Sequence, residues 1–280
     1  MKVRIISGII VGICVVGILA LGPKALGVTI FVASILGLYE FYHAMENVGY
    51  TPMKLLGMMF TLAIPVITFS DKLSQPMEIR IDGIEMNFFS VGQLLMMLLI
   101  FLTVILRNKK YNIADGAITL FGGYYVVFFL SFLMLLRRLD YGLILVILAI
   151  IGTVATDTMA FQIGIKYGKK KLIPSISPKK TIVGSVGGFA GAVVIVFIYG
   201  FILTITKLYI IPLYHYCILG FIIAAASEVG DLAASAIKRY AGIKDFGKIM
   251  PGHGGILDRI DSLIFTAPVV YYYIQFFVNR

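Results

Sequence analysis

The chain has 280 residues, of which 60% are hydrophobic and 14% are charged, and its net charge is +10. Soluble domains average about 45–50% apolar and about 25% charged residues, so this composition excludes an ordinary soluble domain and predicts an integral membrane protein. The positive charge does not indicate nucleic-acid binding, because the basic residues gather along one predicted membrane face without the polar, aromatic-bearing surface that nucleic acids require.

Apolar stretches of membrane-spanning length recur along the whole chain. A spanning helix needs about 20 mostly apolar residues. Such windows lie near 5–22, 26–45, 55–70, 88–106, 116–136, 142–164, 185–206, 209–230 and 256–277. The first window reaches spanning length and no convincing cleavage site follows it, so we expect a retained helix and not a secretory signal. We therefore expect an all-α, polytopic membrane protein with about nine transmembrane helices.

The positions of Lys and Arg predict the orientation, because positively charged loops stay on the cytoplasmic side. With a cytoplasmic N-terminus, seventeen of the 24 basic residues fall on the cytoplasmic side and seven on the other. Two dense clusters, at 166–180 and 238–248, exceed what orientation needs and indicate lipid headgroups or nucleotide phosphates as partners. We expect a multi-pass protein of the cell membrane, that is, the inner or cytoplasmic membrane.

Acidic residues divide the chain into two halves. The spans before about residue 140 hold almost none, with Glu40 as the exception, whereas Asp157, Glu228 and Asp231 lie at predicted membrane depth further on. A carboxylate near the bilayer centre costs about 2.5–3.5 kcal/mol, so several together must face a polar cavity or a metal. We expect residues 1–140 to form an N-terminal transmembrane scaffold and residues 141–280 a catalytic region with its active site at the cytoplasmic face.

The eighth window carries a polar stripe. Glu228 and Asp231 are three residues apart, Ser235 follows four later, and Lys238 and Arg239 come three and four after that, so all five share one helix face. The stripe is typical of the wall of a polar channel. The alternative interpretation is that these residues form charge pairs that hold neighbouring helices together.

A second carboxylate pair opens the last window. Asp258 and Asp261 are three residues apart, just after Gly254 and Gly255. Asp258 alone fits a helix cap, whereas Asp261 is less easily explained in that way. If these two residues converge with Asp231, they supply the oxygen ligands that Mg²⁺ prefers, and a second cation stays an open question.

Basic residues and a glycine loop surround these carboxylates in the sequence. Lys238, Arg239, Lys244 and Arg259 are suited to holding phosphates and a leaving group, as phosphoryl or nucleotidyl transfer requires. No Walker A sequence is present, so phosphates would meet loop amides at the glycines, the start of the last helix and basic side chains. His253 is either a general acid or a hydrogen-bonded organiser of the loop.

These residues together resemble the signature of the phosphatidate cytidylyltransferases, also called CDP-diglyceride synthases. Their signature is matched by Ser235, Ile237, Lys238, Arg239, Lys244, Asp245, Gly247, Pro251, His253, Gly254, Gly255, Asp258, Arg259 and Asp261. The resemblance extends upstream to Asp157, Thr158, Ala160, Phe161, Gly168, Lys169, Ser177, Pro178, Lys179, Lys180, Thr181, Gly184, Gly230, Asp231 and Leu232. It covers the second half strongly and the first half only by hydropathy.

The resemblance implies transfer of CMP from CTP to phosphatidate, which gives CDP-diacylglycerol and pyrophosphate and requires a divalent metal. It assigns Asp231 and Asp258 as metal ligands, with Asp261 as a third. Contacts with the two substrates are expected from Asp157, Ser177, Lys179, Lys180, Thr181, Ser235, Gly254 and Gly255. A homodimer is plausible by resemblance only.

Two other classes stay open at this stage. An ion-coupled transporter would also place acids in its helices, but it would not need the dense basic residues and the Gly-His-Gly-Gly loop on one face. A CDP-alcohol phosphotransferase would act on CDP-diacylglycerol, but the spaced Asp motif of those enzymes is missing. A purely structural or lipid-binding membrane protein is the remaining alternative.

Overall fold

The computed structural model describes residues 2–69, 79–81, 84–86, 88–249 and 254–278. The chain divides into two compact units, each assembled from two stretches. The first unit comprises residues 1–134 and 241–258, and the second comprises residues 135–240 and 259–280. The last stretch of the first unit is therefore the loop that precedes the final helix.

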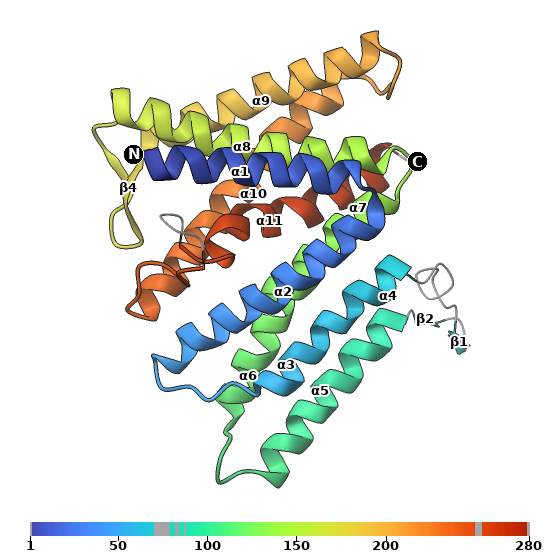
Figure 1. Ribbon diagram of the computed structural model, residues 1–280, viewed down its shortest axis with the longest axis vertical. Coiled ribbons are helices and arrows are strands. Elements are labelled where there is room, and N and C mark those ends of the chain that lie inside the picture. Colours follow the sequence, from blue (N-terminus) through green and yellow to red (C-terminus); the bar gives the residue numbers. More distant parts are fainter. Residues whose placement is uncertain (1, 70–78, 82–83, 87, 250–253, 279–280) are drawn as a thin grey trace. The chain divides into compact units, whose positions relative to one another are not determined.

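Helices make up most of both units (Figure 1). Those of the first unit are α1 (Lys2–Ala20), α2 (Pro23–Glu46), α3 (Lys54–Met59), α4 (Ala63–Phe69), α5 (Phe88–Leu106) and α6 (Ile113–Gly122). A short 3₁₀ turn, η1 (Phe60–Leu62), links α3 to α4, and a π turn, η2 (Gly123–Phe128), continues α6 into α7 (Phe129–Arg138). A small antiparallel hairpin, β1 (Ile79–Ile81) with β2 (Ile84–Met86), precedes α5.

The second unit holds the longest helices. It contains α8 (Gly142–Tyr167), α9 (Ile182–Ile205), α10 (Leu213–Tyr240) and most of α11 (Leu257–Tyr273), which ends in the π turn η3 (Ile274–Val278). Between α8 and α9 the chain forms a hairpin of β3 (Lys171–Ile173) and β4 (Ser177–Thr181). The sequence indicated only a basic loop here. Antiparallel pairing of Lys171 with Thr181 and of Ile173 with Ser177 gives that loop a defined shape.

Six helices in the described part of the chain are long and apolar enough to cross a membrane, namely Pro23–Glu46, Ile113–Arg138, Gly142–Tyr167, Ile182–Ile205, Leu213–Tyr240 and Leu257–Val278. Three shorter apolar helices within the same described ranges, Val11–Ala20, Lys54–Phe69 and Val91–Leu106, overlap the remaining expected windows. The prediction of an all-α, multi-pass membrane protein is confirmed. The count of nine spans and the orientation stay predictions.

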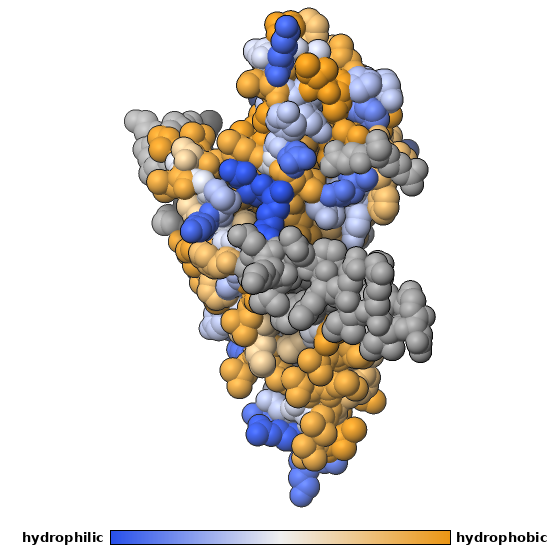
Figure 2. Space-filling model, turned by 90° about the vertical axis from the view of Figure 1, so that its right-hand side faces the viewer, coloured by the Kyte–Doolittle hydropathy of each residue, from blue (hydrophilic) through white to orange (hydrophobic). Residues whose placement is uncertain are grey.

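The surface also fits a membrane protein. Figure 2 shows hydrophobic residues over much of the described surface on one face of the molecule, with hydrophilic residues in separate patches. Large apolar side chains such as Leu98, Phe101, Ile198 and Phe201 are exposed. Exposed apolar residues of this number are expected where helices face lipid acyl chains instead of water.

The core of the first unit is tied together by hydrogen bonds between helices. The fully buried Tyr42 on α2 donates its hydroxyl hydrogen to the carbonyl oxygen of Thr119 on α6, at 2.8 Å. The Thr119 hydroxyl in turn accepts a hydrogen bond from the backbone N–H of Met53, at 2.9 Å. These contacts join α2, α6 and the start of α3 around buried polar groups that would otherwise lack partners.

Small residues determine the packing of α8 against α9 in the second unit, where the two helices run side by side (Figure 1). A Cβ atom on Gly187 would meet Ile163, and one on Gly188 would meet Ala160 and the carbonyl oxygen of Thr156. These glycines therefore permit close packing of the two helices. The β3–β4 hairpin connects the end of α8 to the start of α9, so the close packing of these two helices sets the position of the hairpin.

Candidate active site

Three carboxylates from three helices of the second unit gather near one another. We call Asp157 on α8, Asp231 on α10 and Asp261 on α11 the carboxylate cluster. The charges of Asp157 and Asp231 both interact with that of Asp261, and Asp157 and Asp231 also interact with each other. Like charges brought together in this way raise the free energy of the folded protein unless cations or hydrogen-bond donors offset them.

A lysine from the hairpin offsets part of this charge. Lys180 is the penultimate residue of β4, and its Nζ lies 2.8 Å from Oδ2 of Asp231. The side chains of the pair are 21% and 32% exposed, so the ion pair lies at the edge of the cluster, in reach of solvent. Lys238, two turns along α10 from Asp231, interacts electrostatically with Asp261. Two of the predicted basic residues therefore face the predicted acids.

Hydroxyl and amide donors hold the other cluster members. Asp157 accepts a hydrogen bond from the hydroxyl of Ser227 on α10, at 3.3 Å, and a second from the side chain of Ser262 on α11. Asp261 is 8% exposed and accepts a hydrogen bond from the backbone N–H of Ser262, at 2.8 Å. The two serines thus bridge α8, α10 and α11, although neither belongs to a motif that could be recognised in the sequence.

Glycine lets α10 approach α11 at the cluster. A Cβ atom on Gly230 would lie 2.6 Å from the carbonyl oxygen of Asp261 and 3.0 Å from Cα of Ser262. Any larger residue at this position would push the two helices apart. Because Asp231 directly follows Gly230, the same contact sets the separation between Asp231 and Asp261.

Charged residues at both ends of the polar stripe of α10 form hydrogen bonds with neutral groups of neighbouring elements. One turn before Asp231, the carboxylate of Glu228 accepts a hydrogen bond from the hydroxyl of Ser185 on α9. At the other end of the stripe, Nε of Arg239 donates to the carbonyl oxygen of Ile176, at 3.3 Å, and so connects α10 to the turn of the hairpin. Ser235 lies between them, half-buried.

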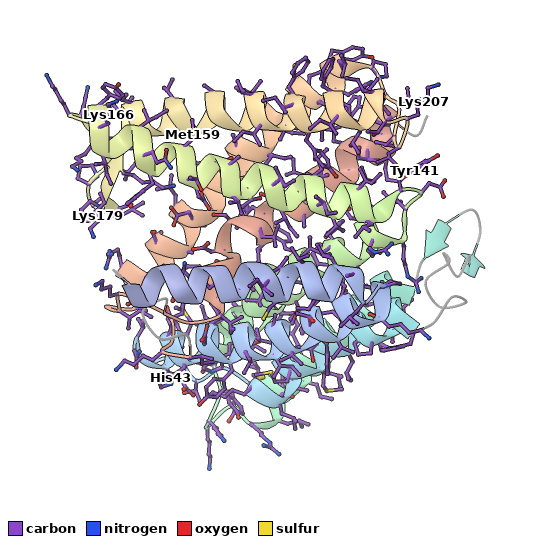
Figure 3. All side chains as sticks on the ribbon, turned by 45° about the horizontal axis from the view of Figure 1, so that its top comes forward. His43, Tyr141, Met159, Lys166, Lys179 and Lys207 are labelled. Atoms are coloured by element: carbon purple, nitrogen blue, oxygen red, sulfur yellow. The ribbon has the colours of Figure 1, made fainter. Side chains whose placement is uncertain are left out.

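The β3–β4 hairpin brings the basic cluster at 166–180 to one end of the second unit. Figure 3 shows Lys166 and Lys179 at the end of the α8–α9 pair that is opposite to Tyr141 and Lys207. On β4, Lys179 is exposed and Ser177 is half-buried. Thr181 is buried, and its hydroxyl caps α9 by accepting a hydrogen bond from the N–H of Gly184, at 3.1 Å. Thr181 therefore has a structural role, because it caps α9 and so positions the hairpin that carries Lys180.

Asp258 and the glycine loop belong to the first unit. Oδ2 of Asp258 accepts hydrogen bonds from the backbone N–H groups of Phe246, at 2.8 Å, and Gly255, at 3.0 Å. Asp258 is the second residue of α11, so it does not occupy the N-cap position that the sequence suggested, and its carboxylate instead binds backbone amides that precede the helix. Gly254 adopts a φ of 83°, where a Cβ would lie 2.8 Å from the same carboxylate oxygen.

Glu40 is the site residue that sequence reasoning passed over. Its buried carboxylate accepts hydrogen bonds from the N–H groups of Ile256, at 3.1 Å, and Leu257, at 2.8 Å. The amides of Gly255, Ile256 and Leu257 therefore bind protein carboxylates in this structure and are not open to a phosphate. The one available signal was an acid alone within the apolar windows of the first half.

The remaining predicted residues can be placed more briefly. Lys244 is exposed in the stretch that follows α10, and Arg259 is exposed in the first turn of α11. His253 lies outside the described residues. In the second unit the structure thus brings together Asp157, Lys180, Asp231, Lys238 and Asp261, and in the first unit it brings Asp258 together with Gly254 and Gly255.

The donor set of the carboxylate cluster suits a hard cation such as Mg²⁺, which prefers oxygen ligands. Over the described residues, no group of three or more His, Cys, Asp or Glu side chains is close enough to hold one metal ion. Mg²⁺ is usually bound through one or two carboxylates, with water and substrate phosphates completing its shell. The cluster therefore fits a metal that arrives with a phosphate substrate better than a closed structural site.

Comparison with known proteins gives matches along nearly the whole chain. The model of the cytidylyltransferase family matches residues 2–277. A phosphatidate cytidylyltransferase of Bacillus subtilis is 31% identical in an alignment of 281 positions that covers 99% of this chain and 98% of the relative. A phosphatidate cytidylyltransferase of Staphylococcus saprophyticus is 31% identical over 271 residues, covering 96% and 97% of the two chains.

A further relative shows a higher identity over about half of the chain. A phosphatidate cytidylyltransferase of Thermotoga maritima is 39% identical over 148 residues, which is 52% of this chain and 54% of the relative. These matches agree with the resemblance seen in the Ser235 to Asp261 signature. With a family model that spans residues 2–277, the chain belongs to the cytidylyltransferase family.

Proposed function

We propose that this chain is a phosphatidate cytidylyltransferase, which transfers CMP from CTP to phosphatidate and forms CDP-diacylglycerol and pyrophosphate. The family match and the full-length similarity to the Bacillus subtilis enzyme support the reaction class. The observation that carries the proposal is the ion pair between Lys180 and Asp231 within a cluster that also contains Asp157 and Asp261. Acids and bases collected on one set of membrane helices are what a phosphate-handling site needs.

The reaction balances without a protein base. A phosphate oxygen of phosphatidate attacks the α-phosphorus of CTP, and a new P–O–P linkage forms. The bond from that phosphorus to the oxygen that bridges it to the β-phosphate breaks, and its electron pair leaves with pyrophosphate. A phosphate monoester is already largely dianionic near neutral pH, because its second pKa is about 6, so His253 is not needed to activate it.

The protein side chains act by position and charge. Lys180 and Lys238 would hold phosphate oxygens near the cluster, and Lys179 and Arg239, which lie on β4 and α10, would bind the leaving pyrophosphate. Asp231 and Asp261 would hold Mg²⁺, which when bound would neutralise the negative charge that develops on the phosphates. Asp258 belongs to the first unit, and its place among the metal ligands stays a prediction.

The proposed placement in the membrane follows from the basic residues. Six lysines lie between residues 166 and 180. Figure 3 shows two of them, Lys166 and Lys179, at the end of the α8–α9 pair that is opposite to Tyr141 and Lys207. By the positive-inside rule we expect this hairpin on the cytoplasmic side, as in the topology proposed with a cytoplasmic N-terminus and about nine spans. Bacterial relatives favour the cytoplasmic membrane as the location.

Within this proposal, residues 1–140 act mainly as scaffold and residues 141–280 carry the chemistry. The diacyl tails of phosphatidate would lie between helices while its phosphate meets the nucleotide at the cytoplasmic mouth. A homodimer is expected from the resemblance alone.

The test is a transfer assay on the purified protein in detergent. CTP, phosphatidate and Mg²⁺ are supplied, and pyrophosphate and CDP-diacylglycerol are followed together. We expect both products in equal amounts, and neither product when phosphatidate is left out. If no lipid-dependent pyrophosphate is released, the proposed function is wrong. Flux of an ion without CTP turnover would then favour a transporter.

A further inference from the structure

Glu40 connects two segments of the first unit that are far apart in the sequence. It lies on α2 and is 4% exposed, and its two carboxylate oxygens accept the N–H groups of Ile256 and Leu257. Leu257 is the first residue of α11. A side chain from α2 therefore caps the start of the helix that carries the last acidic pair of the signature.

The loop approaches Glu40 so closely that only glycine fits at two positions. A Cβ atom on Gly247 or on Gly255 would collide with the Glu40 carboxylate. Gly255 also donates its N–H to Asp258, so the same glycine touches both acids. The absence of side chains at these positions is thus explained by the space that the carboxylate occupies.

Glu40 and Asp258 together hold four backbone amides of one loop. Asp258 binds the N–H groups of Phe246 and Gly255, and Glu40 binds those of Ile256 and Leu257. The two negative charges interact with each other, which is unfavourable. The amides and the positive N-terminal end of the 17-residue α11 offset this repulsion.

We propose that Glu40 is a positioning residue for the reaction: its carboxylate fixes the start of α11 and thereby the orientation of Asp258 and of the backbone at Phe246 and Gly255. The inference rests on the proposed function, because it assigns a role in that reaction. A purely structural alternative exists, in which the same hydrogen bonds stabilise the fold and do nothing for turnover. A positioning role predicts a lower kcat in folded protein that lacks the Glu40 carboxylate, whereas a purely structural role predicts an unaltered kcat.

The test replaces Glu40 with Gln. Gln keeps the side-chain length but presents an NH₂ group, which cannot accept from a backbone N–H, so at least one of the two bonds is lost. Glu46→Gln is the matched control, because Glu46 is an acid on the same helix whose partners are Lys54 and His43 and not the loop. For each protein we would measure kcat per folded molecule, the KM for CTP and for phosphatidate, and amide hydrogen exchange.

We expect Glu40→Gln to lower kcat by roughly 10- to 100-fold, since small displacements of reacting groups have effects of this size, with a smaller change in either KM. Amide exchange should accelerate in peptides that cover Gly255 to Leu257 and stay slow in α6, which would show a local release. Glu46→Gln should keep the kcat and the exchange pattern of the unaltered protein.

One result would overturn the inference, namely an unaltered kcat per folded molecule in Glu40→Gln. It would leave Glu40 only a structural role, whether or not amide exchange becomes faster in the first unit. If Glu40→Gln does not fold, Gly247→Ala decides, because its methyl group disturbs the same carboxylate: a comparable loss of kcat supports the inference and a normal kcat refutes it. If the unaltered protein makes no CDP-diacylglycerol, the proposed function itself has failed.

Discussion

Asp231→Asn removes one negative charge from the carboxylate cluster while it keeps nearly the same side-chain shape. The Nζ of Lys180 and Oδ2 of Asp231 are 2.8 Å apart, and at an effective dielectric constant of about 20 their gross attraction is about 6 kcal/mol. Desolvation and screening cancel most of this, because the side chains are 21% and 32% exposed. Asn still offers Lys180 an amide oxygen, so we expect the free energy of unfolding to fall by only about 1 kcal/mol.

The effect on the reaction should be much larger than the effect on stability. Without the charge of Asp231 the cluster would bind Mg²⁺ and the phosphates in the wrong geometry, and loss of one preorganised electrostatic group typically costs about 100-fold or more in rate. That corresponds to about 2.7 kcal/mol of transition-state stabilisation. CMP transfer by purified protein in detergent would be measured beside a thermal unfolding curve of the same sample.

A double variant separates this role from simple charge pairing. If Asp231 only neutralises Lys180, then Lys180→Met combined with Asp231→Asn restores a balanced pair of neutral side chains and most of the activity. We expect the double variant to stay at least as inactive as Asp231→Asn. Recovery in the double variant, or more than about one third of normal activity in Asp231→Asn, would refute the reasoning.

Further predictions concern the other acids, the metal and the helix packing. Asp258→Asn should fold, since an amide oxygen can still accept from Phe246 or Gly255, yet lose about 100-fold in turnover; near-normal rates would exclude an essential role. Removal of divalent cations by a chelator should abolish CMP transfer, and Mg²⁺ should restore it; turnover that persists in the chelator would argue against a metal. Gly220→Ala should lower the free energy of unfolding by about 1–3 kcal/mol, measured by thermal unfolding, because its methyl group would lie 2.6 Å from Cα of Val193; unchanged stability would show that α9 can shift.

Composition and periodicity predicted the membrane helices well, because a spanning helix has to be apolar along its whole length. Every expected window overlaps an apolar helix among the described residues. Spacing along one helix also placed Glu228, Asp231 and Lys238 on one face of α10, as their contacts bear out for Asp231 and Lys238. These features are local, so they can be read from a single stretch of sequence.

Partners from distant stretches could not be predicted in the same way. Nothing in the sequence shows that the basic loop folds into a hairpin whose Lys180 reaches Asp231, because the pairing depends on how α8 and α9 pack. Ser227 and Ser262 look like ordinary small helix residues until α8, α10 and α11 meet around Asp157. Glu40 and Leu257 are 217 residues apart, and only the folded first unit shows that they bind each other.

The most direct measurement uses CTP that carries a radioactive label at its α-phosphate, and compares it with CTP labelled at its γ-phosphate. The purified protein would be incubated with each nucleotide, phosphatidate and Mg²⁺, and the lipid would be extracted. Transfer of CMP predicts that label from the α-phosphate enters the lipid while label from the γ-phosphate leaves with pyrophosphate. Label from the γ-phosphate in the lipid, or no label from either nucleotide, would contradict the account.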